Sequence, residues 1–309
     1  MFLGDGYCTL AIPRTPHTLL MLTAVSWGVW LPYLAAFAIL IVAVSATRNE
    51  FAQNQGLSKI VLLAPVFIAI PIAVFGVQHF TAAQFVARMV PTWIPGHMFW
   101  TLFVGVCLIA AALSIAARKY SWLSSALLGL MILLFVCLIS VPAIAGAPRN
   151  RLLWAVGVRD LAFSAGAFSL AASHKEAWKQ QDRYRVLTLA RFFIAVAITF
   201  FGVEQVLHPE FAPGVPLAKL TPLWIPVHLL WGYATGAVFV VGGICLLINK
   251  QARLAATWLG LVTLLLVAII YVPIVVADPS DIGNAFNYLV DTLLLSGTLL
   301  ALAGALSPE

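Results

Sequence analysis

Charged residues are scarce in this chain of 309 residues, because aspartate, glutamate, lysine and arginine make up only 9% of it. A soluble protein usually carries about 25% charged residues. Hydrophobic residues account for 62% and the mean hydropathy is +1.02, so most side chains must face lipid or other apolar helices. The net charge of +6 comes from lysines and arginines in short connectors between apolar runs, which is typical of orientation signals in membrane proteins. We therefore expect the lipid bilayer, and no nucleic acid, as a partner.

Recognisable catalytic motifs are also missing from the sequence. The four cysteines, Cys8, Cys107, Cys137 and Cys245, form no CxxC pair, whereas a thiol–disulfide enzyme needs closely spaced, accessible thiols. The chain contains no P-loop, GxSxG, HExxH or CxxCH motif. No predicted helix carries histidines or carboxylates at i, i+3 or i+4 on one face, so we predict no metal site. These absences leave the cofactor unspecified and favour a role other than catalysis by the chain alone.

Long apolar runs, in contrast, are abundant. A helix that crosses a bilayer needs roughly 20 mostly apolar residues, and nine runs are long enough. They cover residues 18–45, 59–80, 97–117, 121–145, 152–172, 186–206, 227–248, 254–276 and 284–305. The first run is longer than the roughly 7–15 apolar residues of a signal peptide, so we expect it to remain as a span. The predicted fold class is an all-α polytopic membrane protein with about nine transmembrane helices.

The lysines and arginines of the connectors are distributed unevenly between the two sides of such a protein. Nine alternating spans put ten of them on one side and five on the other. Because the side richer in lysine and arginine faces the cytoplasm, we expect the N-terminus outside and the C-terminus in the cytoplasm. The predicted location is the inner, cytoplasmic membrane of a prokaryote.

Two phrases of ten residues, PTWIPGHMFW at 91–100 and PLWIPVHLLW at 222–231, show nearly the same pattern with an offset of 131. Upstream, FGVQH at 75–79 returns as FGVEQ at 201–205 with an offset of 126, and a five-residue insertion within LHPEFAPGVPLAKL reconciles the two offsets. Each unit contains four spans, an even number, so the sequence predicts two parallel repeats of a four-helix bundle. The expected divisions are an N-terminal segment with an extra span (1–58), the first repeat (59–173), a cytoplasmic linker (174–185) and the second repeat (186–309).

Each of the two phrases carries prolines on both sides of a tryptophan. Proline removes backbone donors and restricts the preceding residue, so we expect a bent, non-helical connector followed by a span that begins near His97 or His228. Tryptophan suits the boundary between lipid and water. The residues of these two interfacial connectors are Pro91, Trp93, Pro95, Pro222, Trp224 and Pro226. Such a connector either anchors the chain at the interface or forms a lid over a cavity open to the outer face.

Polar side chains recur at matching positions in the outer half of both units. Asp160 and Asp291 are equivalent and lie on the order of 12 Å inside their spans, where an unpaired carboxylate is unfavourable. The candidate residues for a ligand or proton site are Asp160, Asp291, His97, His228, Gln78, His79, Glu204 and Gln205. We expect each aspartate to accept hydrogen bonds from the histidine, the glutamine or backbone groups freed by the prolines. Arg159 points about 100° away from Asp160 around the helix, so that pairing is not required.

This set of polar residues has two interpretations. It is either a buried clasp that fixes the packing of the helices or a ligand or proton site in one or both bundles.

The four-span unit resembles the DoxX-like membrane proteins. The resemblance rests on the FG…H ending of the first span, an outer connector that runs into P…IP.H, a second span rich in small residues and a polar residue in the fourth span. Both units, about 59–172 and 186–305, show it, although Gln205 stands where the first unit has His79. The resemblance implies a four-helix membrane bundle. For some family members it also implies a place in thiosulfate:quinone oxidoreductases or an association with redox-defence proteins.

Three functions remain open from the sequence. The resemblance and the paired polar groups favour a redox-associated accessory protein that binds a quinone or another small apolar ligand in an outward-facing bundle pocket. Other membrane or redox subunits would then be its partners. The carboxylates of Asp160, Asp291 and Glu204 favour a proton-coupled transporter of a small solute. The third interpretation is a non-catalytic scaffold or assembly subunit of a larger membrane complex.

Overall fold

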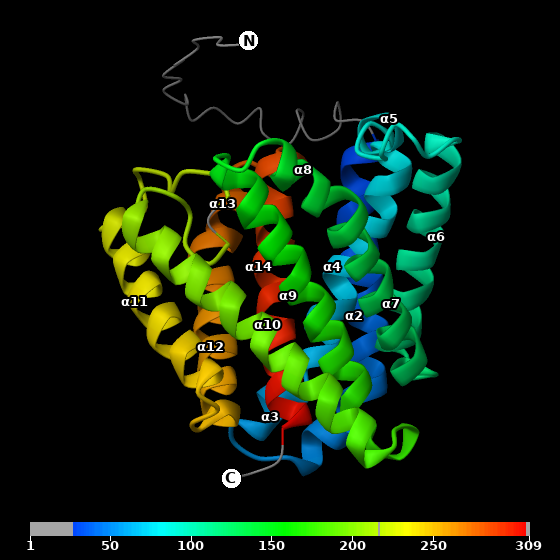
Figure 1. Ribbon diagram of the computed structural model, residues 1–309, viewed down its shortest axis with the longest axis vertical. Helices are drawn as coiled ribbons and strands as arrows, with labels where there is room; N and C mark the ends of the chain where they lie inside the picture. The colour runs from blue at the N-terminus through cyan, green and yellow to red at the C-terminus, as the bar shows by residue number, and fades with distance from the viewer. Residues whose placement is uncertain (1–26, 216, 307–309) are drawn as a thin grey trace, which may run out of the picture.

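A computed structural model of the chain describes residues 27–215 and 217–306. Cys8 and the start of the first predicted span lie outside this part. Apart from an isolated antiparallel bridge between Phe211 and Leu220, the secondary structure of the described residues is helical. Nine of their helical segments are long and apolar enough to cross a membrane (Figure 1). The predicted class, an all-α polytopic membrane protein, is confirmed.

Seven spans are each carried by one main α-helix. These helices are α2 (Trp27–Gln53), α4 (Ala64–Thr81), α6 (His97–Ala116), α9 (Arg151–Ser173), α10 (Gln180–Leu207), α11 (His228–Leu247) and α14 (Asn287–Ala305). Four short segments accompany them: α3 (Ser58–Val61), α5 (Ala83–Ala87), the 3-10 turn η2 (Lys175–Ala177) and the π-helical turn η4 (Ile282–Phe286). We call the end of the bundle at α5 and α8 the outer end, and the end where the chain leaves α14 the inner end (Figure 1).

The other two spans are interrupted by a π-helical turn near the outer end. They consist of α7 (Ser121–Phe135), η1 (Val136–Ser140) and α8 (Val141–Gly146), and of α12 (Ala252–Leu266), η3 (Val267–Tyr271) and α13 (Val272–Ala277). Pro142 and Pro273 are the second residues of the short helices α8 and α13. Proline has no N–H to donate and its ring crowds the carbonyl of the preceding turn. A π-helical turn just before it accommodates this defect in the hydrogen-bond ladder.

Two helix ends differ from the sequence prediction. α2 continues to Gln53 instead of ending near residue 45, and α10 begins at Gln180, inside the segment predicted to be a solvated linker. Both extensions contain arginine and glutamine, which are good helix formers, so the helices continue past the apolar stretch. Glu50 on the extension of α2 also pairs with Arg118 at 2.5 Å.

α9 and α14 occupy the centre of the molecule (Figure 1). α9 packs against α7, α10 and α14, and α14 packs against α4, α9 and α12. The fourth span of each predicted unit therefore contacts the first span of the other unit. Small residues allow this close approach: a Cβ added to Gly297 of α14 would lie 2.9 Å from the backbone carbonyl carbon of Phe67 on α4.

The peripheral helices expose apolar side chains on their outward faces. Phe37 on α2, Phe99 on α6 and Val241 on α11 are each more than 60% exposed. Exposed aromatic and aliphatic side chains on helices of this length are what a protein surrounded by lipid requires. The predicted partnership with the lipid bilayer agrees with this surface.

The two proline-rich connectors at the outer end have the same backbone turn. The N–H of Ile94 donates to the carbonyl of Pro91 at 2.9 Å, and the N–H of Ile225 donates to that of Pro222 at 3.0 Å. Both following helices begin at the histidine, and each is preceded by a residue in the left-handed region, Gly96 (φ 74°) and Val227 (φ 48°). Trp93 and Trp224 are both exposed.

Candidate functional site: a charged cluster between α9 and α14

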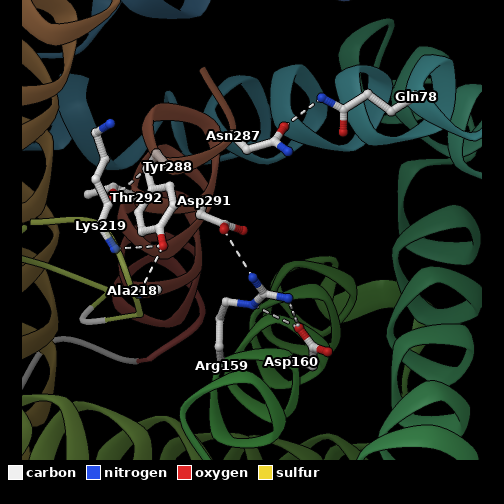
Figure 2. A network of polar contacts seen from close by, with 9 residues as sticks. All are labelled: Gln78, Arg159, Asp160, Ala218, Lys219, Asn287, Tyr288, Asp291 and Thr292. Atoms are coloured by element: carbon white, nitrogen blue, oxygen red, sulfur yellow. Dashed lines mark hydrogen bonds and ion pairs between the residues drawn. The ribbon is translucent and has the colours of Figure 1, made fainter. Parts of the chain in front are cut away.

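Three charged side chains meet in the outer half of the bundle, between α9 and α14 (Figure 2). The guanidinium of Arg159 donates from Nε to Oδ1 of Asp160 at 2.9 Å, and its Nη2 also lies 2.9 Å from that oxygen. Its Nη1 donates to Oδ2 of Asp291 at 3.0 Å. The two aspartates that the sequence predicts to be equivalent thus share one cation.

The cluster is largely shielded from solvent and lipid. The side chain of Asp291 is 7% exposed, and those of Arg159 and Asp160 are 20% exposed. The ring of Phe163, one turn further along α9, lies 5.7 Å from Cζ of Arg159. Asp160 does pair with its neighbour Arg159, a pairing that helix geometry alone does not require. The arginine side chain is long enough for one guanidinium to reach back to its neighbour and across to α14.

The charges in this cluster do not balance, because one guanidinium faces two carboxylates. Arginine is permanently protonated, so the cluster with both carboxylates ionised carries one surplus negative charge. An uncompensated charge at this depth in a membrane is unfavourable, and binding of a proton or another cation relieves it. Proton binding is therefore the chemistry that the arrangement of Arg159, Asp160 and Asp291 supports most directly.

A second polar contact lies in the same layer and joins α4 to α14. The amide Nε2 of Gln78 donates to Oδ1 of Asn287 at 2.5 Å, and both side chains are half-buried. Asn287 lies one turn before Asp291 on α14, so the two contacts follow one another along this helix (Figure 2). Together they tie α14 to α4 and to α9.

The insertion between α10 and α11 folds into the outer end of the bundle. Its bridge between Phe211 and Leu220 forms a short hairpin, and Val215 in its tip is fully buried. The hydroxyl of Tyr288 accepts hydrogen bonds from the backbone N–H groups of Ala218 and Lys219, each at 2.9 Å. This hairpin therefore covers α14 one turn above Asp291.

Glu204 and Gln205 of α10 do not contact the aspartates. Gln205 binds the hairpin directly, and Glu204 binds Arg151, which contacts the hairpin. Oε2 of Glu204 lies 2.9 Å from Nη1 of Arg151 at the start of α9. The Arg151 guanidinium also donates to the carbonyl of Leu217 and lies over the ring of Phe211 at 4.3 Å. Gln205 donates from Nε2 to the carbonyl of Phe211 at 2.9 Å, while its buried Oε1 has no partner among the described residues.

The three histidines of the predicted set stand apart from the charged cluster. Nδ1 of His79 lies 2.7 Å from the carbonyl of Phe75, one turn earlier on α4. Within the described residues no hydrogen bond joins His97 or His228 to an aspartate, so the predicted histidine–aspartate contact is wrong there. The histidines mark the first residues of α6 and α11, where the connectors place them at the rim of the bundle.

Four residues of the site were not among the sequence candidates: Arg159, Arg151, Asn287 and Tyr288. Arg159 carries a visible signal, because it is a charge inside an apolar run. At the offset of 131 its counterpart is Val290, so a search for repeated polar positions passes over it. Asn287 and Tyr288 lie at the edge of a span, where polar residues are ordinary.

No group of three or more histidine, cysteine, aspartate or glutamate side chains among residues 27–215 and 217–306 is arranged to hold a metal ion. Comparisons of the chain with protein-family models, with curated proteins and with solved structures find no match.

Proposed function

We propose that this protein is a proton-coupled membrane transporter of a small solute, with Arg159, Asp160 and Asp291 as its proton-binding site. The observation that carries the proposal is the surplus carboxylate in a shielded cluster at membrane depth. Intramembrane carboxylates that lack a full complement of cations are typical of proton relays. Protonation of one carboxylate leaves a single neutral ion pair, and its release restores the surplus charge.

The surroundings of the cluster support this proposal through two kinds of contact. The π-helical turns η1 and η3 interrupt the neighbouring spans near the outer end, and such turns frequently occur at functional sites. A Cβ on Gly157 of α9 would lie 3.3 Å from Cβ of Ser140 in η1, so this turn packs directly against the helix that carries Arg159. The hairpin is the second contact: it covers the outer end of α14, where the hydroxyl of Tyr288 accepts from the N–H groups of Ala218 and Lys219.

Infrared spectroscopy of the protein in lipid tests the proton site without knowledge of the solute. A protonated carboxyl group that titrates with pH is expected in the wild-type spectrum. Asp160→Asn and Asp291→Asn each balance the charge of Arg159 and are expected to remove this signal. Asp278→Asn serves as the matched control, because Asp278 is exposed in an outer connector and its loss should leave the signal unchanged.

Flux measurements in proteoliposomes complete the test. Gradients of a panel of small solutes are imposed and the internal pH is followed with a dye. A solute that drives acidification or alkalinisation in the wild type and not in Asp291→Asn supports coupled transport. An unchanged carboxyl signal in both aspartate variants, or a flux that neither variant alters, contradicts the proposal.

We also infer that the two four-span units arose by duplication and that both enter the membrane from the same side. The bounds of α11, α12 and α13 are those of α6, α7 and α8 shifted by 131, including the π-helical turns between them. Asp160 and Asp291, equivalent at this offset, meet on one guanidinium. The uneven connector charges favour an N-terminus outside, a cytoplasmic C-terminus and the inner membrane of a prokaryote.

A second function, a redox-associated accessory protein of the DoxX-like kind that binds a quinone, is favoured by a hollow at the outer end. It has a volume of about 630 Å³ and lies between the end of α4, α5 and the start of α6. Phe80, Phe85 and Met98 supply apolar walls, and Arg88 supplies a donor suited to a quinone carbonyl. A quinone that raises the melting temperature of the wild type and not of Arg88→Gln supports this function. Equal melting of both proteins with and without quinone counts against it.

A further inference from the structure

A cavity of about 730 Å³ lies at the inner end of the bundle, far along α9 and α14 from the charged cluster. Its walls come from the first turns of α10, the connector between α11 and α12, and the last residues of α14. On α10, Arg183, Leu187 and Arg191 recur every four residues, so the helical period puts them on one face. Arg253 joins them from the start of α12.

Helix ends, not carboxylates, hold two of these arginines in place. Arg183 donates from Nε to the carbonyl of Ala172 at 2.7 Å and from Nη2 to the carbonyl of Ala305 at 2.6 Å. Arg191 donates from Nη1 to the carbonyl of Leu246. The last carbonyls of a helix carry only partial negative charge, so these contacts orient the two guanidinium groups without neutralising them.

The described residues of the cavity wall include three cations and no acidic side chain. Its other polar residues are uncharged: Gln180, Gln181, Tyr184, Thr188 and Asn249. Arg253 is half-buried, and its guanidinium makes no hydrogen bond or ion pair with any residue of the described ranges, although its backbone carbonyl accepts from Thr257. Three positive charges around one cavity create a positive electrostatic potential inside it, and a bound anion lowers that potential.

We propose that this cavity binds a phosphate-bearing anion, with Arg253 as the free donor and Arg183 and Arg191 as fixed positive charges. The planar fork of a guanidinium matches two oxygens of a phosphate. The cavity is much larger than a bare phosphate ion, so it fits a phosphate with a substituent. Leu187, Ala252 and Leu306 in the same wall offer apolar contacts to that substituent.

The position of the cavity at the end of the spans suits the head group of an anionic phospholipid. Basic pockets between transmembrane helices at the cytoplasmic boundary bind such head groups. A soluble phosphate compound from the aqueous side has the same charged chemistry. The two sources can be distinguished by competition: inorganic phosphate competes for the cavity if the ligand is a soluble phosphate compound, and does not compete if it is a lipid head group.

The test uses the full-length protein in detergent with added lipid. Thermal unfolding and lipid retention in native mass spectrometry are compared for phosphatidylglycerol and for phosphatidylcholine, which carries a compensating choline cation. Inorganic phosphate is added in a second arm. The variants are Arg253→Gln, Arg253→Lys and, as the matched control, Lys250→Gln. Lys250 is exposed in the same connector and does not line the cavity.

Phosphatidylglycerol is expected to stabilise the wild type more than phosphatidylcholine does. Arg253→Gln should weaken its binding by about tenfold, the effect of one charge-assisted contact, while Arg253→Lys retains part of the affinity and Lys250→Gln retains all of it. Competition by inorganic phosphate identifies a soluble ligand, and its absence identifies the lipid head group. Equal effects of both lipids together with no effect of inorganic phosphate, or equal losses in Arg253→Gln and Lys250→Gln, overturn the proposal.

Discussion

The guanidinium of Arg159 is the one cation that Asp160 and Asp291 contact among the described residues, so the three side chains respond differently to substitution. Removing either aspartate leaves a balanced pair. Removing the arginine leaves two carboxylates together in a shielded place, where like charges repel and solvation is poor. The relative loss of stability on substituting Arg159, Asp160 or Asp291 therefore reports the charge balance of the cluster.

Arg159→Gln is expected to lower the free energy of unfolding by about 3–5 kcal/mol, the range for breaking a buried ion pair by removing one partner. Asp160→Asn should change it by less than about 1 kcal/mol, because Arg159 keeps its contact with Asp291. Thermal unfolding in detergent measures both, and Arg149→Gln, an exposed arginine before α9, is the control. A loss in Asp160→Asn as large as that in Arg159→Gln contradicts the shared-cation arrangement.

At this scale the sequence predicts which carboxylates lie in the membrane, but not their partners. Asp160 and Asp291 stand out because apolar runs surround them. Their contact through Arg159 depends on how α9 and α14 pack and on the reach of a flexible side chain, neither of which is a local property. His97 and His228 have the predicted place at helix starts, yet the connectors keep them away from the aspartates.

At the scale of helices, the glycine of each FGV phrase lies at a helix crossing. A Cβ on Gly202 of α10 would lie 2.7 Å from the backbone nitrogen of Val240 on α11, and one on Gly76 of α4 would lie 3.1 Å from that of Ile109 on α6. Backbone atoms cannot retreat from such a contact as the end of a side chain can. Both α4–α6 and α10–α11 therefore depend on a missing side chain for their close approach.

Gly202→Ala is expected to destabilise the protein by about 1–3 kcal/mol, the range for overpacking a close contact. Gly146→Ala is the matched control, because Gly146 ends α8 with nothing within 4 Å of the added Cβ. At that position alanine should leave the free energy of unfolding unchanged or raise it by up to about 1 kcal/mol, because alanine has a better helix propensity than glycine. Melting temperatures compare the two variants, and an equal response of both would show that α10 and α11 tolerate a wider spacing.

The hairpin between α10 and α11 depends on Arg151. This side chain pairs with Glu204, binds the carbonyl of Leu217 and covers the ring of Phe211. Arg151→Gln removes the ion pair and should speed hydrogen exchange of the hairpin amides by about tenfold or more, since local opening then costs less free energy. Exchange measured by mass spectrometry tests this, with Arg149→Gln as control. Unchanged exchange in Arg151→Gln means that Tyr271 and Tyr288, which also bind the hairpin, are sufficient.

Element positions follow from the sequence wherever apolar length decides them. The bounds of α6, of α9 and of the span that runs from α7 to α8 lie within a few residues of the predicted runs, because lipid requires a helix over each apolar stretch. Apolar length does not predict the polar end of a helix such as α2, because residues with good helix propensity continue the helix beyond the apolar stretch. The hairpin was visible only as an insertion, because its fold depends on contacts with α9 and α14 and not on a periodic pattern.

At the scale of the whole molecule, the two predicted units are interlocked. α9 packs against α10 and α14, and α14 packs against α4, so each central helix is covered by helices from both halves of the chain. Most residues of α14 are buried, from Tyr288 near its start to Ala305 at its end. A half-molecule would expose this surface, together with an Asp291 that has lost Arg159.

A split of the chain after Ser173 therefore gives two fragments, 1–173 and 174–309, that should depend on one another. Expressed alone, the second fragment would place Asp291 against lipid without its cation. The cost is at most roughly 2.5–3.5 kcal/mol, the value for a charge at the centre of a span. The α4 and α9 faces of α14 would also be uncovered. We expect each fragment alone to aggregate or be degraded, and the two expressed together to co-purify through a tag on either one. Asp291→Asn in the isolated second fragment removes the charge but not the uncovered surface, so it should restore part of the yield at most. Two fragments that are each monodisperse alone and do not associate would mean that the contacts of α9 and α14 across the units contribute little, and that each four-span unit is a stable bundle by itself.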